Sequence, residues 1–164
     1  MLTRGRYDVA DLHFYGCVED IPVEVQWVKA HMPPGKSWIS TENGGPDIRC
    51  PSTPVSWEQN PEEYERLQAR QVSERLSACA DSGGLVCLWF SFLDMTGETS
   101  VFTHMGLIDP RALKDKVKQL KGRRQTSDRR PVETLSQDQR SELAKLLRKK
   151  AAYAAFKSFT ATHR

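Results

Sequence analysis

Three strand patterns, each followed by a helical pattern, constrain the fold of this chain more than any other feature. The strand patterns cover residues 7–15, 37–42 and 85–93. The third, LVCLWFSFL, is almost entirely apolar, as expected of a parallel strand that is covered on both faces. Strands that alternate with helices form a parallel sheet with right-handed crossovers. The sequence therefore predicts an α/β fold with about three parallel strands, which form either a small open sheet or part of a larger closed one.

Residues that start and stop helices separate these units. The first helix is predicted over residues 17–32, because a Pro-Pro-Gly sequence follows it. After a long polar loop, Asn60 is predicted to cap the second helix, with Pro61 in its first position. A third, basic helix is predicted to begin near Pro110.

The last part of the chain departs from this alternation. Residues 122–131 show no periodic pattern and are interpreted as disordered. Beyond them, Ser136 and Gln139 have the spacing of a capping box. This box is predicted to open a single last helix that runs to about Phe159.

The charge of the chain is unevenly distributed, although its net value is only +3. Residues 111–130 contain nine basic and two acidic residues, so the remainder carries 15 basic and 19 acidic residues. A basic stretch of this kind could contact nucleic acid, but it has no interleaved aromatic residues. We therefore interpret it as a solvated helix and loop, and do not expect nucleic acid as a partner.

Several other classes of protein are disfavoured by the sequence. No apolar run is long enough for a membrane-spanning helix, and the N-terminus lacks the apolar core of a signal peptide, so we expect a soluble protein whose localisation stays open. The four cysteines form no CxxC pair and have no zinc-ligand spacing with the histidines. We expect buried free thiols in preference to disulfides, and neither a metal nor a cofactor.

Polar and aromatic residues gather where the predicted strands end. His13 and Tyr15 end the first strand, Glu42 and Asn43 the second, and Trp89 lies near the end of the third. The carboxyl ends of parallel strands meet at one edge of a sheet, where active sites of barrel enzymes lie. A carboxylate, an imidazole and aromatic rings at one mouth would suit a sugar, whose ring stacks on aromatics while its hydroxyls bind polar groups.

Five motifs in order give the chain a family resemblance. They are DLHFY at 11–15, WISTENG at 38–44, LWFSF at 88–92, MGLID at 105–109 and KAAYAAFK at 150–157. Together they resemble the last three βα units of the clan A glycoside hydrolases, which are retaining enzymes on the (β/α)8 or TIM-barrel fold. The resemblance spans residues 7–159.

The resemblance implies a fold as well as an activity. The chain would be a single partial TIM-barrel domain over residues 1–164, with three parallel strands, each followed by a helix, and an extended C-terminal helical segment. Residues 111–150 would be a basic helical and loop insertion before the final helix, because the family's connection at this point is shorter. One substitution also departs from the family motif, since Ala151 stands in place of a proline.

The same resemblance implies roles for the residues at the strand ends. Glu42 would be the catalytic nucleophile, Tyr15 would orient it, and His13 would bind a sugar hydroxyl or assist that network. The substrate-binding residues that the resemblance implies are Trp89 and Asn43. Trp57, in the long loop, could extend the aromatic platform, with surface packing as its alternative role. The partner would be a carbohydrate that carries an O-glycosidic bond.

One element of the family mechanism has no counterpart in the sequence. Retaining enzymes use two carboxyl groups roughly 5–5.5 Å apart, and the family's acid/base glutamate follows an asparagine on the fourth strand. Glu62 follows Asn-Pro but lies in a helix start, and Asp94 lies in a loop. We therefore expect a glycosidase fragment that is inactive or weak alone, completed by an N-terminal half or by self-association. The alternatives are a non-catalytic carbohydrate-binding or interaction module and a basic nucleic-acid-binding protein.

Overall fold

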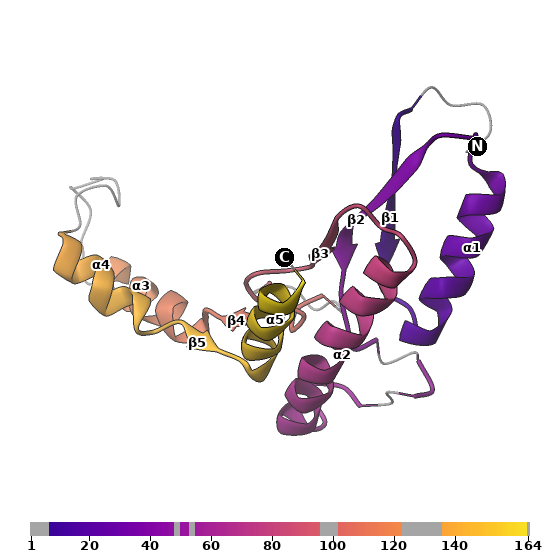
Figure 1. Ribbon diagram of the computed structural model, residues 1–164. Helices are drawn as coiled ribbons and strands as arrows, with labels where there is room; N and C mark the ends of the chain where they lie inside the picture. Colours follow the sequence, from indigo (N-terminus) through magenta and orange to yellow (C-terminus); the bar gives the residue numbers. More distant parts are fainter. Residues whose placement is uncertain (1–6, 48–49, 53–54, 96–101, 123–135, 164) are drawn as a thin grey trace.

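The computed structural model describes residues 7–47, 50–52, 55–95, 102–122 and 136–163 (Figure 1). Its centre is a three-stranded parallel sheet of order β1-β2-β3. The strands are β1 (Val9–Phe14), β2 (Ser37–Asn43) and β3 (Cys87–Trp89). The mixed α/β class and the parallel sheet that the strand–helix alternation predicts are therefore confirmed.

The two helices between the strands begin and end close to where the sequence places them. A short 3-10 turn, η1 (Val18–Asp20), leads into α1 (Ile21–His31), which stops before the Pro-Pro-Gly sequence. The second helix is α2 (Pro61–Asp81). The Asn60 side chain accepts a hydrogen bond from the Glu63 backbone N–H at 3.1 Å, so the predicted cap is confirmed.

One face of the sheet is covered by helices and the other is open. Ala10, Phe14 and Trp38 point to the covered side, where they pack with Ile21 and Val25 of α1. The alternate residues of the strands lie on the opposite side, here called the open face: Val9, Asp11 and His13 of β1 and Leu88 of β3. All four side chains of the open face are exposed.

The third strand differs from its prediction. Only Cys87–Trp89 is strand, and Leu88 within it is 49% exposed. Its apolar neighbours are exposed too: Leu85, Val86, Phe92 and Leu93. The expectation that residues 85–93 form a strand covered on both faces is wrong for the described chain, because α2 covers one side of β3 and nothing described covers the other.

The C-terminal part is also divided differently. The capping box of Ser136 is confirmed, but it opens a short helix, α4 (Gln137–Ala144). Next, β5 (Arg148–Lys149) pairs antiparallel with β4 (Ile108–Asp109), and α5 (Ala151–Thr162) follows. The prediction of one helix to Phe159 is therefore wrong.

The remaining connection matches expectation in part. The basic helix predicted near Pro110 is α3 (Arg111–Gly122), and it projects with α4 away from the sheet (Figure 1). The part of the 122–131 segment beyond Gly122, which we interpret as disordered, lies outside the described residues. None of the helices described combines the length and apolar character that crossing a bilayer requires.

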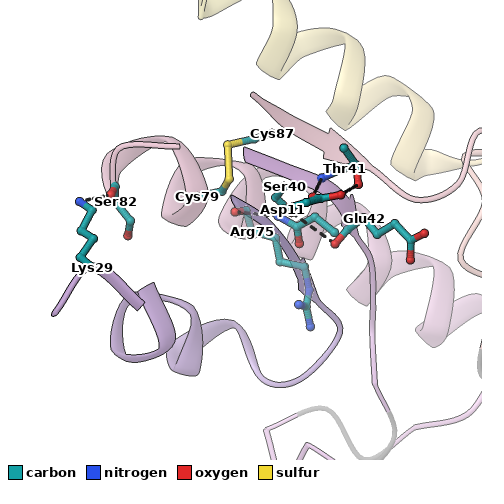
Figure 2. Close-up of a disulfide and its surroundings, with 10 residues drawn as sticks. Asp11, Lys29, Ser40, Thr41, Glu42, Arg75, Cys79, Ser82 and Cys87 are labelled. Carbon is teal, nitrogen blue, oxygen red and sulfur yellow. Dashed lines mark hydrogen bonds between the residues drawn. A yellow bond between two sulfur atoms is a disulfide. The ribbon is translucent and has the colours of Figure 1, made fainter. Parts of the chain in front are cut away.

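Two disulfides correct the expectation of free thiols. Cys17 and Cys50 are bonded across a separation of 33 residues, and Cys79 is bonded to Cys87. Figure 2 shows how the second bond joins the end of α2 to β3. The Cα–Cα distances are 5.3 and 6.2 Å, within the range that a disulfide requires. Spacing along the sequence could not reveal these pairs, because each joins two elements that meet only in the folded chain.

An ion-pair network fixes the β4–β5 pair and explains why the chain is extended there. Asp109 accepts hydrogen bonds from the Arg111 Nε at 2.8 Å and from the Arg148 Nη2 at 3.1 Å. Arg148 also donates to Glu65 of α2 at 2.9 Å. If the chain were one continuous helix through these residues, the Arg148 side chain would not reach Asp109 and Glu65 at the same time.

This network predicts a loss of stability in acid. Although burial disfavours the charged form, hydrogen bonds from Arg111 and Arg148 hold the pKa of Asp109 well below its usual range. A depressed pKa stabilises the fold above the unfolded value of about 3.9, and the contribution disappears as pH falls through the folded value. We expect Asp109→Asn to lower the free energy of unfolding at pH 7 by about 2 kcal/mol.

Urea unfolding of this variant and of the unmodified chain at pH 7 and pH 3 tests the prediction, and the difference should shrink at the lower pH. Glu63→Gln is the matched control, because Glu63 pairs with Arg66 on the solvent side of α2 and should change stability little. An equal difference at both pH values would contradict the assignment.

Candidate active site

The orientation of Glu42 depends on one extra residue in β2. While β1 advances from Asp11 to His13, β2 advances from Ile39 to Glu42, so β2 gains a residue over its neighbour. The pairing with β3 shifts over the same part of β2. An extra residue reverses which side the following residues face. Glu42 therefore lies on the side of His13, although simple alternation from Trp38 would place it under the helices.

Three of the residues predicted for the site meet there. The Tyr15 hydroxyl donates to Glu42 Oε2 at 2.5 Å, and His13 Nδ1 lies 3.3 Å from the same oxygen. Burial, together with the hydrogen bond to Glu42, raises the pKa of Tyr15 well above its usual range. Tyr15 therefore keeps its proton and can act as a hydrogen-bond donor to the carboxylate at neutral pH.

A buried arginine that the sequence analysis did not single out supports this arrangement. Arg75 of α2 is fully buried and donates to the backbone carbonyls of Phe14, at 3.4 Å, and Gly16. Burial lowers its pKa to about 10, so it stays cationic at neutral pH. Arg75 thus anchors the chain on both sides of Tyr15. Arg75 is 59 residues from Gly16 along the chain and lies in a helix with many charged residues, so local sequence patterns do not reveal this role.

The loop that follows Glu42 passes close to α2 and to the aromatic residues. A Cβ added at Gly45 would lie 2.4 Å from the Gln71 Oε1 and 2.7 Å from the Arg75 Nε, so a larger residue there would displace these two buried side chains. The Asn43 side chain is buried on the covered side, where its Nδ2 donates to the Arg75 carbonyl at 3.4 Å. The structure therefore does not place Asn43 beside His13 on the open face.

The contacts of Trp89 and Trp57 are with other groups than the Glu42 carboxylate. Trp89 is 8% exposed, packs against Leu76 of α2, and donates from Nε1 to the Met105 carbonyl at 2.9 Å. Its ring is thus part of the core on the covered side, which leaves too little surface for a sugar to stack on. Trp57 stacks on His104, with ring centroids 4.0 Å apart, and beneath the Arg111 guanidinium.

Two phenylalanines that the sequence analysis did not assign contact Tyr15 instead. The Tyr15 ring meets Phe90 edge-on at 6.0 Å and Phe102 at 4.9 Å between centroids. Phe90 and Phe102 also contact each other, and both are partly exposed. They form an aromatic cluster next to the Glu42 carboxylate. The sequence contains one indication of this role for Phe90, which directly follows Trp89 in the apolar third strand pattern.

The carboxylates considered for the acid role are placed elsewhere. Asp94 is buried and paired with Lys150 at 3.1 Å, and Glu62 is exposed in the first turn of α2. Within the described parts of the chain, the single group of potential metal ligands is Cys17, Glu19 and Cys50, and its two cysteines are bonded to each other. Neither Asp94 nor Glu62 is therefore assigned the acid role.

Comparison with known proteins adds no further assignment. No family model matches the chain, and no match was found among curated proteins or solved structures. Function is therefore inferred from the geometry around Glu42 and from the order of the motifs.

Proposed function

We propose that this chain carries the nucleophile half of a retaining glycoside hydrolase site, with Glu42 as the nucleophile. The observation that supports this best is the position of the Glu42 carboxylate. It lies at the carboxyl end of the middle strand of a parallel sheet, on the open face, with the Tyr15 hydroxyl at 2.5 Å and His13 at 3.3 Å.

The contacts of Glu42 suit attack on an anomeric carbon. A carboxylate nucleophile must be ionised and aimed, and a hydrogen bond from Tyr15 favours the ionised form. Attack forms a bond between the carboxylate oxygen and the anomeric carbon while the glycosidic oxygen leaves with a proton from the acid/base group. Water, deprotonated by that same group, then releases the sugar. His13, which is exposed next to Glu42, would bind a hydroxyl of the sugar.

The remaining residues of the site would come from further strands that complete the partial barrel. In the described sheet β1 and β3 each have one neighbour, and the apolar side chains of Val9 and Leu88 on the open face are exposed. An N-terminal half that adds strands at both edges would cover this face and bring the second carboxylate to within about 5–5.5 Å of Glu42. Self-association is the other way to cover it.

The platform for the sugar ring is assigned to a different aromatic group than the sequence suggests. Trp89 is buried, whereas Phe90 and Phe102 are partly exposed and contact Tyr15. Aromatic faces next to the nucleophile can stack on the apolar face of a sugar. We assign this role to Phe90 and Phe102.

Covalent trapping tests the nucleophile without needing the missing acid. Dinitrophenyl 2-deoxy-2-fluoro-glycosides carry a leaving group that departs without protonation, and their glycosyl-enzymes hydrolyse slowly. We expect one of the gluco, galacto, manno or xylo reagents to add one sugar mass to the chain. Peptide mapping by mass spectrometry should locate it on Glu42.

Matched variants make the result specific. Glu42→Gln should abolish the adduct, whereas Glu63→Gln, which changes a partly exposed carboxylate on α2 that pairs with Arg66, should leave it unchanged. An adduct that survives Glu42→Gln, or none with any of the four reagents, would contradict the proposal. Sugar affinity measured by calorimetry without any adduct would favour the carbohydrate-binding alternative.

A further inference from the structure

Two cysteines and a glutamate lie close together beside the turn that follows β1. Cys17 precedes η1, Glu19 lies within it, and Cys50 comes from the loop after β2. The two Sγ atoms and a carboxylate oxygen of Glu19 all lie within 4.8 Å of one another. Thiolates and carboxylates are both ligands of zinc. Because Cys17 and Cys50 are bonded to each other, these donors become available to a metal only after reduction.

Ser52 connects the glutamate to one of the cysteines. Its hydroxyl lies 3.0 Å from Cys50 Sγ and donates a hydrogen bond to the Glu19 carboxylate. A hydrogen bond from the backbone N–H of Glu19, the bond from Ser52 and the charge of Arg75 lower the pKa of Glu19. Glu19 is therefore a carboxylate at neutral pH, and it is exposed, so a metal ion can reach it from solvent.

The charges around this group suit a divalent cation. Two thiolates and the Glu19 carboxylate carry three negative charges, of which a divalent ion leaves one. The Arg75 guanidinium attracts Glu19 and donates to the carbonyl of Gly16, which directly precedes Cys17. Arg75 is buried, so its positive charge is available to balance the charge that remains.

Side-chain rotation can bring the two sulfur atoms to the separation that a metal requires. Two sulfur atoms bound tetrahedrally to one zinc ion, each at about 2.3 Å, lie roughly 3.8 Å apart. The Cα atoms of Cys17 and Cys50 are 5.3 Å apart, so rotation about the Cα–Cβ bonds can open this distance while the backbone keeps its course. Water would supply the fourth ligand on the solvent side of Glu19.

We propose that Cys17, Glu19 and Cys50 form a zinc site in the reduced chain, in which the metal replaces the disulfide as the link between the turn after β1 and the loop after β2. A dithiol supplies the two electrons and two protons that convert the disulfide to two thiols, and is itself oxidised to a disulfide. Zinc then binds the two sulfur atoms and the carboxylate, and the two thiol protons pass to solvent. The site does not depend on the role of Glu42.

Titration of the whole chain with Cd²⁺ tests the proposal, because cadmium can replace zinc at thiolates and its bonds to sulfur absorb in the ultraviolet. The chain carries Cys79→Ala and Cys87→Ala, which leaves Cys17 and Cys50 as its only cysteines. After reduction with a phosphine, which competes for the metal less than a dithiol does, we expect this absorption to saturate at one Cd²⁺ per chain. Zn²⁺ should then displace the cadmium, and the same chain before reduction should show no absorption.

Matched variants assign the ligands. In the reduced chain Glu19→Gln should weaken Cd²⁺ binding by about tenfold or more. Asp20→Asn makes the same change at the neighbouring exposed carboxylate and should leave the affinity unchanged. If the alanine pair destabilises the fold, the reduced unmodified chain supplies a second comparison. It should bind Cd²⁺ about tenfold or more tightly than a reduced chain with Cys17→Ser and Cys50→Ser.

Urea unfolding gives a readout that needs no absorption signal. Zn²⁺ should raise the midpoint of the reduced chain, because it binds the folded site, and leave that of the disulfide-bonded chain unchanged. No thiolate absorption after reduction, equal binding before and after it, or an affinity that Glu19→Gln leaves unchanged would overturn the proposal. None of these measurements uses a sugar, so their outcome is independent of the trapping experiment.

Discussion

Replacing Lys150 by methionine is expected to lower the free energy of unfolding by about 3–5 kcal/mol. The Lys150 Nζ lies 3.1 Å from Asp94 Oδ1 and donates to the His104 carbonyl at 2.7 Å. The two side chains are 0% and 2% exposed, so neither charge is solvated. Burial raises the pKa of Asp94 and lowers that of Lys150, in both cases against the attraction between them. Methionine would leave the Asp94 carboxylate buried without its cation.

A double-variant cycle measured by urea unfolding separates this effect from packing. Adding Asp94→Leu to Lys150→Met removes both charges and should restore most of the lost stability. Lys157→Met makes the same change on the exposed side of α5 and should alter stability by less than about 0.5 kcal/mol. A Lys150→Met variant within about 1 kcal/mol of the unmodified chain would show that the pair is not buried as described.

Removal of the Cys17–Cys50 disulfide is the second large effect that we expect. The bond closes a loop of 33 residues, for which the loss of unfolded-chain entropy corresponds to about 3–4 kcal/mol. It ties the turn after β1, which begins two residues beyond Tyr15, to the loop that follows Glu42. Cys17→Ser with Cys50→Ser should therefore lower the urea midpoint and loosen the two segments that carry the site.

The second disulfide supplies a matched comparison. Cys79 and Cys87 are 8 residues apart, so removing this pair should cost less, about 2–3 kcal/mol. Thiol titration of the unreduced, unfolded chain should find no free cysteine, since all four are paired. Four reactive thiols, or an equal loss of stability for both pairs, would contradict these assignments.

Features that depend on neighbours in the sequence could be predicted from the sequence alone. The helix starts at Asn60 and Ser136 follow from side chains that bond backbone groups three residues away. The order of the three parallel strands and the two helices between them follows from apolar periodicity in the same local way. The residues of the site were also predictable in part, because motif order placed His13, Tyr15 and Glu42 at strand ends.

The remaining features depend on residues that are distant in the sequence. The extra residue in β2 turns Glu42 to the open face, and it exists only as a difference in register between paired strands. Likewise, Arg148 interrupts the expected last helix because Glu65 and Asp109 bind it across the fold.

For this protein the sequence alone therefore determined the three parallel strands with the helices between them, the helix caps at Asn60 and Ser136, and the three residues that meet at the site. Tertiary structure alone decided which side of the sheet each of them faces, that Trp89 belongs to the core, that Arg75 anchors the chain on both sides of Tyr15, and which cysteines are bonded. The physical reason is that caps and periodicity are set by contacts within one or two turns, whereas register, burial and ion pairing are set by whichever segments the fold brings together.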